Sequence, residues 1–194
     1  MPKNKEILDL KGVRKGDRKA FENIYRSYRD GVYAFAYRMV SSRAIAEEVT
    51  HEAFLVLITQ PQRYDTERGS IFTFLCSIAR NHIMHHLRRT MREIEEPFEE
   101  FDSADSANYR ESGEQLKQLL DEELVTEIDR AIRCLPALFR EAIILREFQQ
   151  LSYAQIAEVT ETSIDTVKVR LHRARRALAK ELAPYVQEQR GVLS

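Results

Sequence analysis

The sequence concentrates positive charge near its C-terminal end, in a form that could bind a polyanion. Six Lys and Arg residues lie between Thr166 and Lys180, and no acidic residue interrupts them. On a helix of about 3.6 residues per turn, one narrow stripe is apolar and consists of Val167, Leu171, Ala174 and Leu178. The cations Arg173, Arg176 and Lys180 lie opposite this stripe, and Lys168, Arg170 and Arg175 flank them. Cations on such an exposed face can neutralise phosphates and reach base edges in the DNA major groove.

The residues ahead of this run predict a second, shorter helix. Ser152 and Gln155 have the capping-box spacing, in which each side chain satisfies an unpaired amide at a helix start. Thr160 to Ser163 is a short polar connector, and Ser163 is a suitable N-cap for the basic helix. Two helices joined this closely form a helix-turn-helix. The pattern favours DNA binding over an ordinary solvated basic face, and a helix-turn-helix that contacts only proteins is the open alternative.

Two further polar helix faces lie upstream. One is acidic, because Glu48 and Glu52 are four residues apart with Glu47 beside them, and it could meet basic residues of a partner helix. A solvated acidic face is the alternative there. The other face has the spacing i, i+4, i+7 and i+11 and consists of Asn81, His85, Arg88 and Arg92. It lies largely opposite the apolar side of its helix and could follow a nucleic-acid backbone.

Catalysis and metal binding find less support in the sequence. His82, His85 and His86 have a spacing that can chelate a transition metal on one helix face, but no fourth ligand is apparent. The sequence has no glycine-rich phosphate loop and no Ser, His and Asp set that the helical pattern brings together. We therefore expect a protein that is not an enzyme and that needs no cofactor and no metal.

The apolar periodicity predicts an all-α fold of two small helical domains. Helices are expected over 20–39, from 42 to before Pro61, over 71–91, from 114 to Pro136, and again from Pro136 onward. Turn residues between 60 and 70 predict an ordered loop or a short break. The acidic, aperiodic segment 93–113 predicts a flexible linker, which separates one domain over 1–92 from another over 114–194.

Charge, cysteine content and hydropathy indicate where in the cell we expect the protein to act. The 194 residues include 30 basic and 31 acidic side chains, but the charge is segregated, with five arginines and no acid from Arg68 to Arg92. Cys76 and Cys134 both fall in apolar helical patterns, which predicts two buried, reduced thiols and no disulfide framework. No apolar stretch approaches the length of a membrane span. A soluble, cytoplasmic protein without membrane insertion is expected.

Several of these segments resemble the extracytoplasmic-function sigma factors of bacterial RNA polymerase. Residues 151–157 (LSYAQIA) and 166–175 (TVKVRLHRAR) resemble the fourth conserved region of that family. Residues 46–54 (AEEVTHEAF) are similar to its polymerase-binding helix. Residues 74–81 (FLCSIARN) and 86–89 (HLRR) resemble the segment that recognises the minus-ten promoter element. The order and spacing agree over nearly the whole chain.

The resemblance implies three sets of site residues. Recognition of the minus-thirty-five element is implied for Thr166, Lys168, Val169, Arg170, His172, Arg173 and Arg176. Recognition and melting of the minus-ten element is implied for Arg63, Tyr64, Ser70, Phe72, Asn81, His85, Arg88 and Arg89. The aromatic residues Tyr64, Phe72 and Phe74 could equally belong to the core, which is favoured for Phe74. Binding to core RNA polymerase is implied for Glu47, Glu48, Thr50, His51, Glu52 and Phe54. The implied partners are promoter DNA, the clamp helices of the largest polymerase subunit, the flap of the second-largest subunit, and an anti-sigma factor.

The sequence departs from the family pattern at three positions. Glu161 stands where the family commonly has a glycine in the helix-turn-helix turn, and a left-handed backbone would be costly for Glu. Phe74 replaces the usual Trp, and His85 replaces the usual Asp. The main alternative to a sigma factor is a conventional helix-turn-helix regulator whose N-terminal helices dimerise or sense a signal.

Overall fold

The computed structural model describes residues 3–65, 69–94 and 115–192, with side chains over 9–65, 69–90 and 124–185. Throughout this described part, the regular structure is helical, which confirms the predicted fold class. In chain order the elements are α1 Lys3–Arg14, α2 Arg18–Val40, α3 Arg43–Thr59, the 3-10 turn η1 Pro61–Arg63, α4 Ile71–Ile94, α5 Gln115–Cys134, α6 Ala137–Ile143, the π turn η2 Ile144–Phe148, α7 Tyr153–Thr160 and α8 Ile164–Val192. The predicted linker 93–113 lies outside the described residues beyond Ile94.

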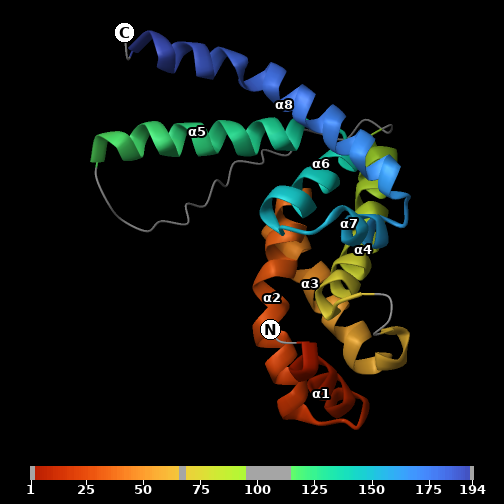
Figure 1. The fold of residues 1–194 in the computed structure, drawn as a ribbon. Helices are drawn as coiled ribbons and strands as arrows, with labels where there is room; N and C mark the ends of the chain where they lie inside the picture. Colours follow the sequence, from red (N-terminus) through yellow and green to blue (C-terminus); the bar gives the residue numbers. More distant parts are fainter. Residues whose placement is uncertain (1–2, 66–68, 95–114, 193–194) are drawn as a thin grey trace.

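The N-terminal half is a helical bundle of α1 to α4, drawn from red to yellow-green in Figure 1. The long helix α2 begins where the Asp17 carboxylate accepts the backbone N–H of Lys19 at 2.8 Å. It ends at Ser41, whose left-handed backbone stops the helix and allows Ser42 to cap α3. The bundle core consists of fully buried side chains from three helices, among them Phe35, Leu57 and Leu75.

The loop between α3 and α4 is anchored to the helical bundle through the buried side chain of Tyr64. Tyr64 is buried, and its hydroxyl donates to the Gly69 carbonyl at 2.7 Å. Arg14 of α1 donates to the Tyr64 carbonyl at 3.0 Å, and the Phe74 ring lies 5.4 Å from that of Tyr64. These contacts tie the two described ends of the loop to the bundle, and residues 66–68 of the predicted loop lie outside the described residues.

The C-terminal half consists of α5 to α8. Pro136 caps α6 directly after α5, so the expected break occurs there, one residue before the new helix starts. The capping box of α7 is present, with Gln155 N donating to Ser152 Oγ at 3.3 Å and Ser152 N donating to Gln155 Oε1 at 2.9 Å. Thr166 N donates to Ser163 Oγ at 3.1 Å, as expected of an N-cap for α8. The predicted helix-turn-helix is therefore confirmed.

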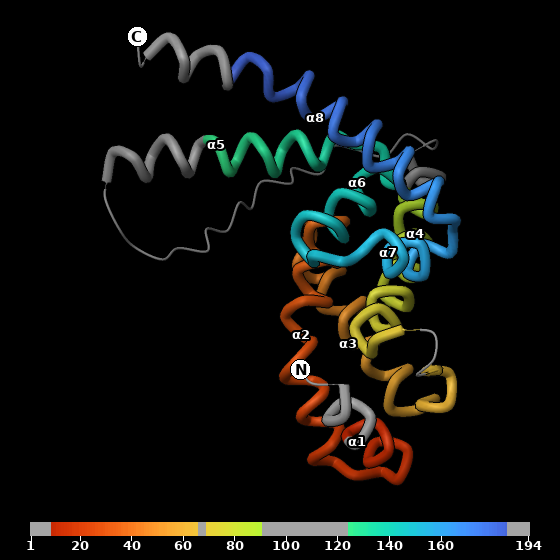
Figure 2. Tube along the Cα trace, in the orientation of Figure 1, coloured from red at the N-terminus to blue at the C-terminus, as the bar shows by residue number. Residues whose placement is uncertain are grey.

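The two halves pack against each other. Figures 1 and 2 show α6 near the end of α2 and α7 beside α4, and the buried hydrophobic residues form one continuous cluster from α1 to α8.

The burial of the two cysteine thiols differs from the prediction at one position. Cys76 is buried, and burial raises the pKa of its thiol, whereas Cys134 at the end of α5 is exposed. The prediction for Cys134 was wrong because the last turn of α5 turns that residue toward solvent. None of the helices described has the length and apolarity to cross a bilayer.

The turn of the helix-turn-helix is formed without the usual glycine. Glu161 adopts the left-handed conformation with φ 52 and ψ 45. Its N–H donates to the Glu158 carbonyl at 3.3 Å, and the N–H of Thr162 donates to the Ala157 carbonyl at 3.0 Å. This is the Schellman pattern that glycine normally completes. The turn thus keeps the geometry that glycine normally provides, and the conformational strain lies in the backbone of Glu161.

Replacing Glu161 with glycine should stabilise the protein. A side chain in the left-handed region costs roughly 1–2 kcal/mol, and the greater freedom of glycine in the unfolded chain offsets about 0.5–1 kcal/mol of that. We expect the free energy of unfolding, measured by urea denaturation, to rise by about 0.5–1 kcal/mol.

A matched control introduces glycine at a right-handed position of the same motif. Ala154 is exposed within α7, so Ala154→Gly should lower the free energy of unfolding by about 1 kcal/mol. If Glu161→Gly were destabilising to a similar extent, the left-handed turn would not be the source of strain.

Candidate DNA- and polymerase-binding surfaces

The basic helix α8 divides into buried and exposed faces largely as predicted. Val167, Leu171 and Ala174 are buried, and Leu178 packs partly buried against the same core. The outward side chains are Lys168, Val169, His172, Arg173 and Arg176. Val169 is 49% exposed although it is apolar, and an exposed branched side chain on this face can contact a thymine methyl group. Thr166 is half-buried beside the cap of the helix.

Arg170 does not share this outward face. Its guanidinium donates to Glu141 of α6 at 2.9 Å, and its side chain is only 14% exposed. The predicted DNA contact of Arg170 is thus at odds with its position here, because its charge is already paired inside the protein. Arg175 similarly donates to Glu147 at 2.7 Å, on the flank of the helix.

Only some of the residues predicted to bind polymerase through α3 are exposed to solvent. Glu47, Glu48 and His51 are exposed and Glu52 is half-buried. Thr50 and Phe54 are buried, and Thr50 donates to the Ala46 carbonyl at 2.7 Å. These two side chains cannot contact a partner in this structure, because they follow the core side of the helix. This corrects their assignment as binding residues.

Two exposed apolar residues of α3 were missed by sequence reasoning. Leu55 is 50% exposed and Ile58 is 46% exposed. Leu55 lies four residues after His51, so it continues the face that begins with Glu47 and Glu48. The apolar pattern alone does not distinguish Leu55 and Ile58 from core residues. Their i+4 and i+7 spacing from His51, however, places them on the same solvent-exposed face of the helix as His51. We call Glu47, Glu48, His51, Leu55 and Ile58 the α3 surface.

The predicted minus-ten residues fall into exposed and buried groups. Arg63, Asn81, His85, Arg88 and Arg89 are exposed, and Ser70 is half-buried, with its hydroxyl accepting the N–H of Thr73 at 3.1 Å. Phe72 is half-buried and stacks on Tyr28, with ring centroids 5.9 Å apart. Of the two places that the sequence allows for Tyr64, a DNA surface or the core, the structure shows the core, and the Tyr64 hydroxyl holds the loop. The side chain of Arg92 lies outside the described residues.

A small pocket of about 120 Å³ joins α3 to α4. It is lined by Ile45, Glu48, Val49, His82, His85, His86 and Arg89. The acidic end of the α3 surface therefore adjoins the polar face of α4. Within the described chain, no three His, Cys, Asp or Glu side chains are placed to hold a metal ion, so the spacing of the histidines is not matched by a metal-binding geometry.

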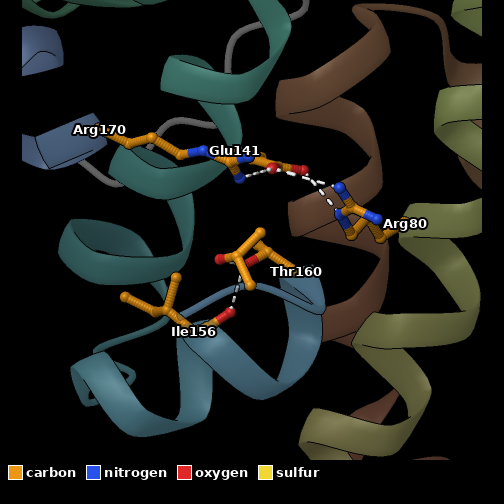
Figure 3. Close-up of polar contacts among 6 residues, drawn as sticks. Arg80, Glu141, Ile156, Thr160 and Arg170 are labelled. Atoms are coloured by element: carbon orange, nitrogen blue, oxygen red, sulfur yellow. Dashed lines mark hydrogen bonds and ion pairs between the residues drawn. The ribbon is translucent and has the colours of Figure 1, made fainter. Parts of the chain in front are cut away.

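The strongest buried electrostatic feature was not predicted. Glu141 of α6 is fully buried and accepts from Arg80 of α4 at 2.8 Å and from Arg170 of α8 at 2.9 Å (Figure 3). Burial raises the pKa of the Glu141 carboxyl, while the hydrogen bond and charge of Arg80 and the charge of Arg170 act to lower it. Three residues far apart in the sequence thus meet around one carboxylate, which we call the Glu141 triad.

Together, the helix-turn-helix, its basic outward face and the separate polar faces of α3 and α4 define a two-domain helical DNA-binding protein. The sequence matches two protein-family models, Sigma-70 region 2 over residues 24–93 and Sigma-70, region 4 over residues 126–178. It is 30% identical over 177 residues to the ECF RNA polymerase sigma factor SigW of Bacillus subtilis (strain 168), covering 89% of this chain and 94% of that protein. It is 34% identical over 184 residues to the ECF RNA polymerase sigma-E factor of Escherichia coli (strain K12), covering 90% and 93%.

The chain therefore belongs to the extracytoplasmic-function (ECF) RNA polymerase sigma factors of the sigma-70 family. Among solved structures, its fold is similar to that of RpoE in complex with the anti-sigma factor NepR from Bartonella quintana, with a TM-score of 0.67, 24% identity, and coverage of 85% of this chain and 98% of that one. CnrH in complex with the cytosolic domain of CnrY gives a TM-score of 0.66 at 19% identity, with 93% and 98% covered. A sigma factor that binds core RNA polymerase and recognises promoters is thus favoured over a conventional regulator.

The division of α3 into core and surface can be tested by stability. Phe54→Ala should lower the free energy of unfolding by about 3–5 kcal/mol, because it leaves a cavity in the bundle. Leu55→Ala removes an exposed side chain and should change that free energy by no more than about 0.5 kcal/mol. Chemical denaturation of both variants measures the difference, and similar losses in the two would contradict the assigned faces.

Proposed function

We propose that this chain directs core RNA polymerase to its promoters with the two domains acting on separate DNA elements. Residues 1–92 bind core polymerase and the minus-ten element, residues 93–113 link the domains, and residues 114–194 read the minus-thirty-five element. The observation that carries the proposal is that each matched sigma-70 region presents an exposed face of suitable chemistry, basic on α8 and acidic to apolar on α3.

The α3 surface is the proposed contact with the clamp helices of the largest polymerase subunit. Glu47 and Glu48 are exposed and can pair with basic residues of a partner. Leu55 and Ile58 supply the apolar part of the same face. An interface needs both, since desolvated apolar side chains provide affinity, and the charges set orientation and association rate.

The outward face of α8 is the proposed reader of the minus-thirty-five element. His172 and Arg173 are exposed in the third turn of α8, on the face that a recognition helix turns toward base edges. Lys168 and Arg176 are placed to contact phosphates on either side, and Val169 offers an apolar contact. Arg170 is left out of this set because of its pairing with Glu141.

The polar face of α4 and the loop before it are the proposed minus-ten site. Asn81, His85 and Arg88 are exposed along α4 and can follow a DNA strand. Arg63 and Phe72 lie at the two sides of the loop, and an aromatic ring such as Phe72 can stack with an unpaired base. Tyr64 contributes by fixing the loop from the core.

Further partners follow from the same proposal. The helix-turn-helix domain would contact the flap of the second-largest polymerase subunit, and an anti-sigma factor would control the chain. The second point is supported by RpoE, which was solved in complex with the anti-sigma factor NepR. We propose that the protein acts in the cytoplasm, where RNA polymerase works, as a transcription factor with no catalytic activity, cofactor or metal of its own.

The proposal predicts that initiation depends on core polymerase and on the α3 surface. Addition of the chain to core polymerase should give specific transcripts from its promoters, and Glu48→Lys should weaken core binding by about tenfold at low salt. Glu22→Lys makes the same charge change on an exposed part of α2 and should have little effect. Unchanged core affinity in Glu48→Lys would refute the clamp assignment, and promoter binding without core-dependent initiation would indicate a conventional regulator.

A second prediction concerns the DNA face of α8. Arg173→Ala should weaken binding to the minus-thirty-five element by about 1–3 kcal/mol if it contacts a base, and should relax specificity there. Arg175→Ala removes the same charge from a side chain that pairs with Glu147, so it should cost less and leave specificity unchanged. Both are measured by DNA-binding titrations over a range of salt concentrations. Equal effects of the two variants would show that the helix acts only through its total charge.

A further inference from the structure

A group of positive side chains surrounds the turn between α1 and α2, outside the surfaces described above. Exposed cations come from the last turn of α1, from the turn itself and from the first turn of α2, and they are Lys11, Arg14, Lys15, Arg18 and Lys19. Asp17 lies among them, but its carboxylate caps α2 by accepting the N–H groups of Lys19 at 2.8 Å and of Ala20 at 3.4 Å. We call the five cations the α1–α2 corner.

The backbone folds tightly at the α1–α2 corner, which brings cations from two helices together. Helices α1 and α2 approach closely at Gly12, because a Cβ built there would lie 2.5 Å from the Cβ of Ala20. Gly16 has a φ of 79, which side chains other than glycine rarely allow, and the N–H of Asp17 donates to the Gly12 carbonyl at 2.9 Å. The cations are therefore held on a defined surface.

The α1–α2 corner differs from most exposed cations of the protein in its lack of acidic partners. Within the described part of the chain, its three lysines and Arg18 form no ion pair with a carboxylate, whereas exposed Arg26 and Arg130 each pair with a nearby Glu. The outward face of α8 shares this feature, since Arg173 and Arg176 have no carboxylate partner among the described residues. A cluster of unpaired cations keeps its charge available for a polyanion.

The α1–α2 corner adjoins the proposed minus-ten site. Nη2 of Arg14 donates to the Tyr64 carbonyl at 3.0 Å, and Arg63, the preceding residue, is exposed. Helix α1 also packs against η1, which precedes the loop. Figure 1 shows α1 at the end of the N-terminal bundle that is farther from α8. The positive surface therefore continues from the loop across to α1.

The course of the chain indicates which DNA reaches the α1–α2 corner. Beyond Ile94 the chain continues to the domain assigned to the minus-thirty-five element, so the C-terminal end of α4 faces upstream DNA. The loop before α4 and then the α1–α2 corner follow in the downstream direction. Bases that are extruded at the loop are unpaired, so the strand that continues toward α1 is single-stranded.

We propose that the α1–α2 corner binds the phosphates of the single DNA strand directly downstream of the minus-ten element. The inference rests on the proposed function and extends its minus-ten site by a contact that reads no bases. Contacts of this kind hold a strand in register without sequence preference. Because the corner binds the unpaired strand, it shifts the promoter toward its melted state.

Binding of the free full-length chain to fluorescent oligothymidylate tests the α1–α2 corner without core polymerase. The triple variant Lys11→Gln, Lys15→Gln, Arg18→Gln should bind an oligomer of about 20 nucleotides roughly tenfold more weakly than the wild type at about 0.1 M salt. The slope of log affinity against log salt concentration should become shallower by about 2, since each phosphate contact to a single strand contributes about 0.7. Arg14 is kept, because it holds the Tyr64 carbonyl.

The matched control removes three cations from other exposed positions. The variant Arg26→Gln, Arg29→Gln, Arg133→Gln has the same net charge and leaves the proposed binding surfaces intact, so it should bind oligothymidylate like the wild type. Equal losses in the two triple variants, or a wild-type chain that does not bind, would overturn the proposal. An equal loss on duplex DNA of the same length would overturn the assignment to a single strand. If the corner variant lost only its binding to vesicles of anionic lipid, the partner would be a membrane surface instead.

Forked promoter DNA tests the same contact in the complete holoenzyme. The strand that carries the minus-ten element ends either at that element or about ten nucleotides beyond it. The wild-type holoenzyme should bind the longer strand more tightly, and the corner variant should lose about tenfold of that preference while its core affinity stays unchanged. The control variant should keep the preference of the wild type.

The outcomes separate the α1–α2 corner from the proposed function. A corner variant that keeps the full preference for the longer strand would overturn the inference, even if the chain initiates normally with core polymerase. Failure of the wild type to initiate with core polymerase would overturn the proposed function, and the oligothymidylate titration would still decide whether the corner binds a single strand.

Discussion

A single buried carboxylate determines how the two halves of this protein meet. Glu141 has no exposed surface, and a carboxylate in that position is tolerated only because guanidinium groups surround it. Removing one partner of such a group typically costs about 3–5 kcal/mol when no water can replace it. The orientation of α6 relative to α4 and α8 is therefore constrained more tightly at this point than hydrophobic packing alone would require.

The same constraint affects the DNA-reading helix. Arg170 flanks the outward cations in the sequence of α8, yet its guanidinium donates to the buried carboxylate of Glu141. Arg175 is also paired, with Glu147, on the other flank of the helix. The exposed basic face is thus narrower than the sequence of the helix indicates, and it centres on His172, Arg173 and Arg176. A narrower face is better suited to fitting one groove than to general attraction for polyanions.

Stability and function make opposite demands on the junction between the domains. A continuous hydrophobic cluster and polar contacts favour the compact state, whereas a sigma factor has to reach two separated promoter elements. Interfaces between domains that must separate are typically more polar than permanent cores. At this junction the Arg38 guanidinium lies over the Phe148 ring, and Arg140 donates to the Met39 carbonyl. These contacts and the pair of Arg80 with Glu141 fit that description, since arginine can return to water at modest cost.

The helical fold, the element order and the helix-turn-helix were predictable from local patterns. Apolar residues at three- and four-residue steps define the helices, and the Ser152–Gln155 box and Ser163 define the ends of α7 and α8. The sequence located the turn at Glu161 but not its backbone conformation. Whether Glu161 adopts the strained left-handed conformation or the turn is rearranged depends on how α7 and α8 pack. The resemblance of three sequence blocks to the ECF sigma factors also agreed with the family that the comparisons show.

Only the tertiary structure decided which side chains of each helix are available. Phe54, for which the resemblance implies a binding role, is buried, and so is Tyr64, whereas Leu55 and Ile58, for which no surface role was predicted, are exposed. A helical repeat gives the direction of a face but not how far neighbouring helices cover it, because coverage depends on packing between distant segments. For the same reason no local pattern could reveal that Arg80, Glu141 and Arg170 meet. The sequence by itself determined the helices and the family, and the packing of those helices determined which charges face DNA and which hold the domains together.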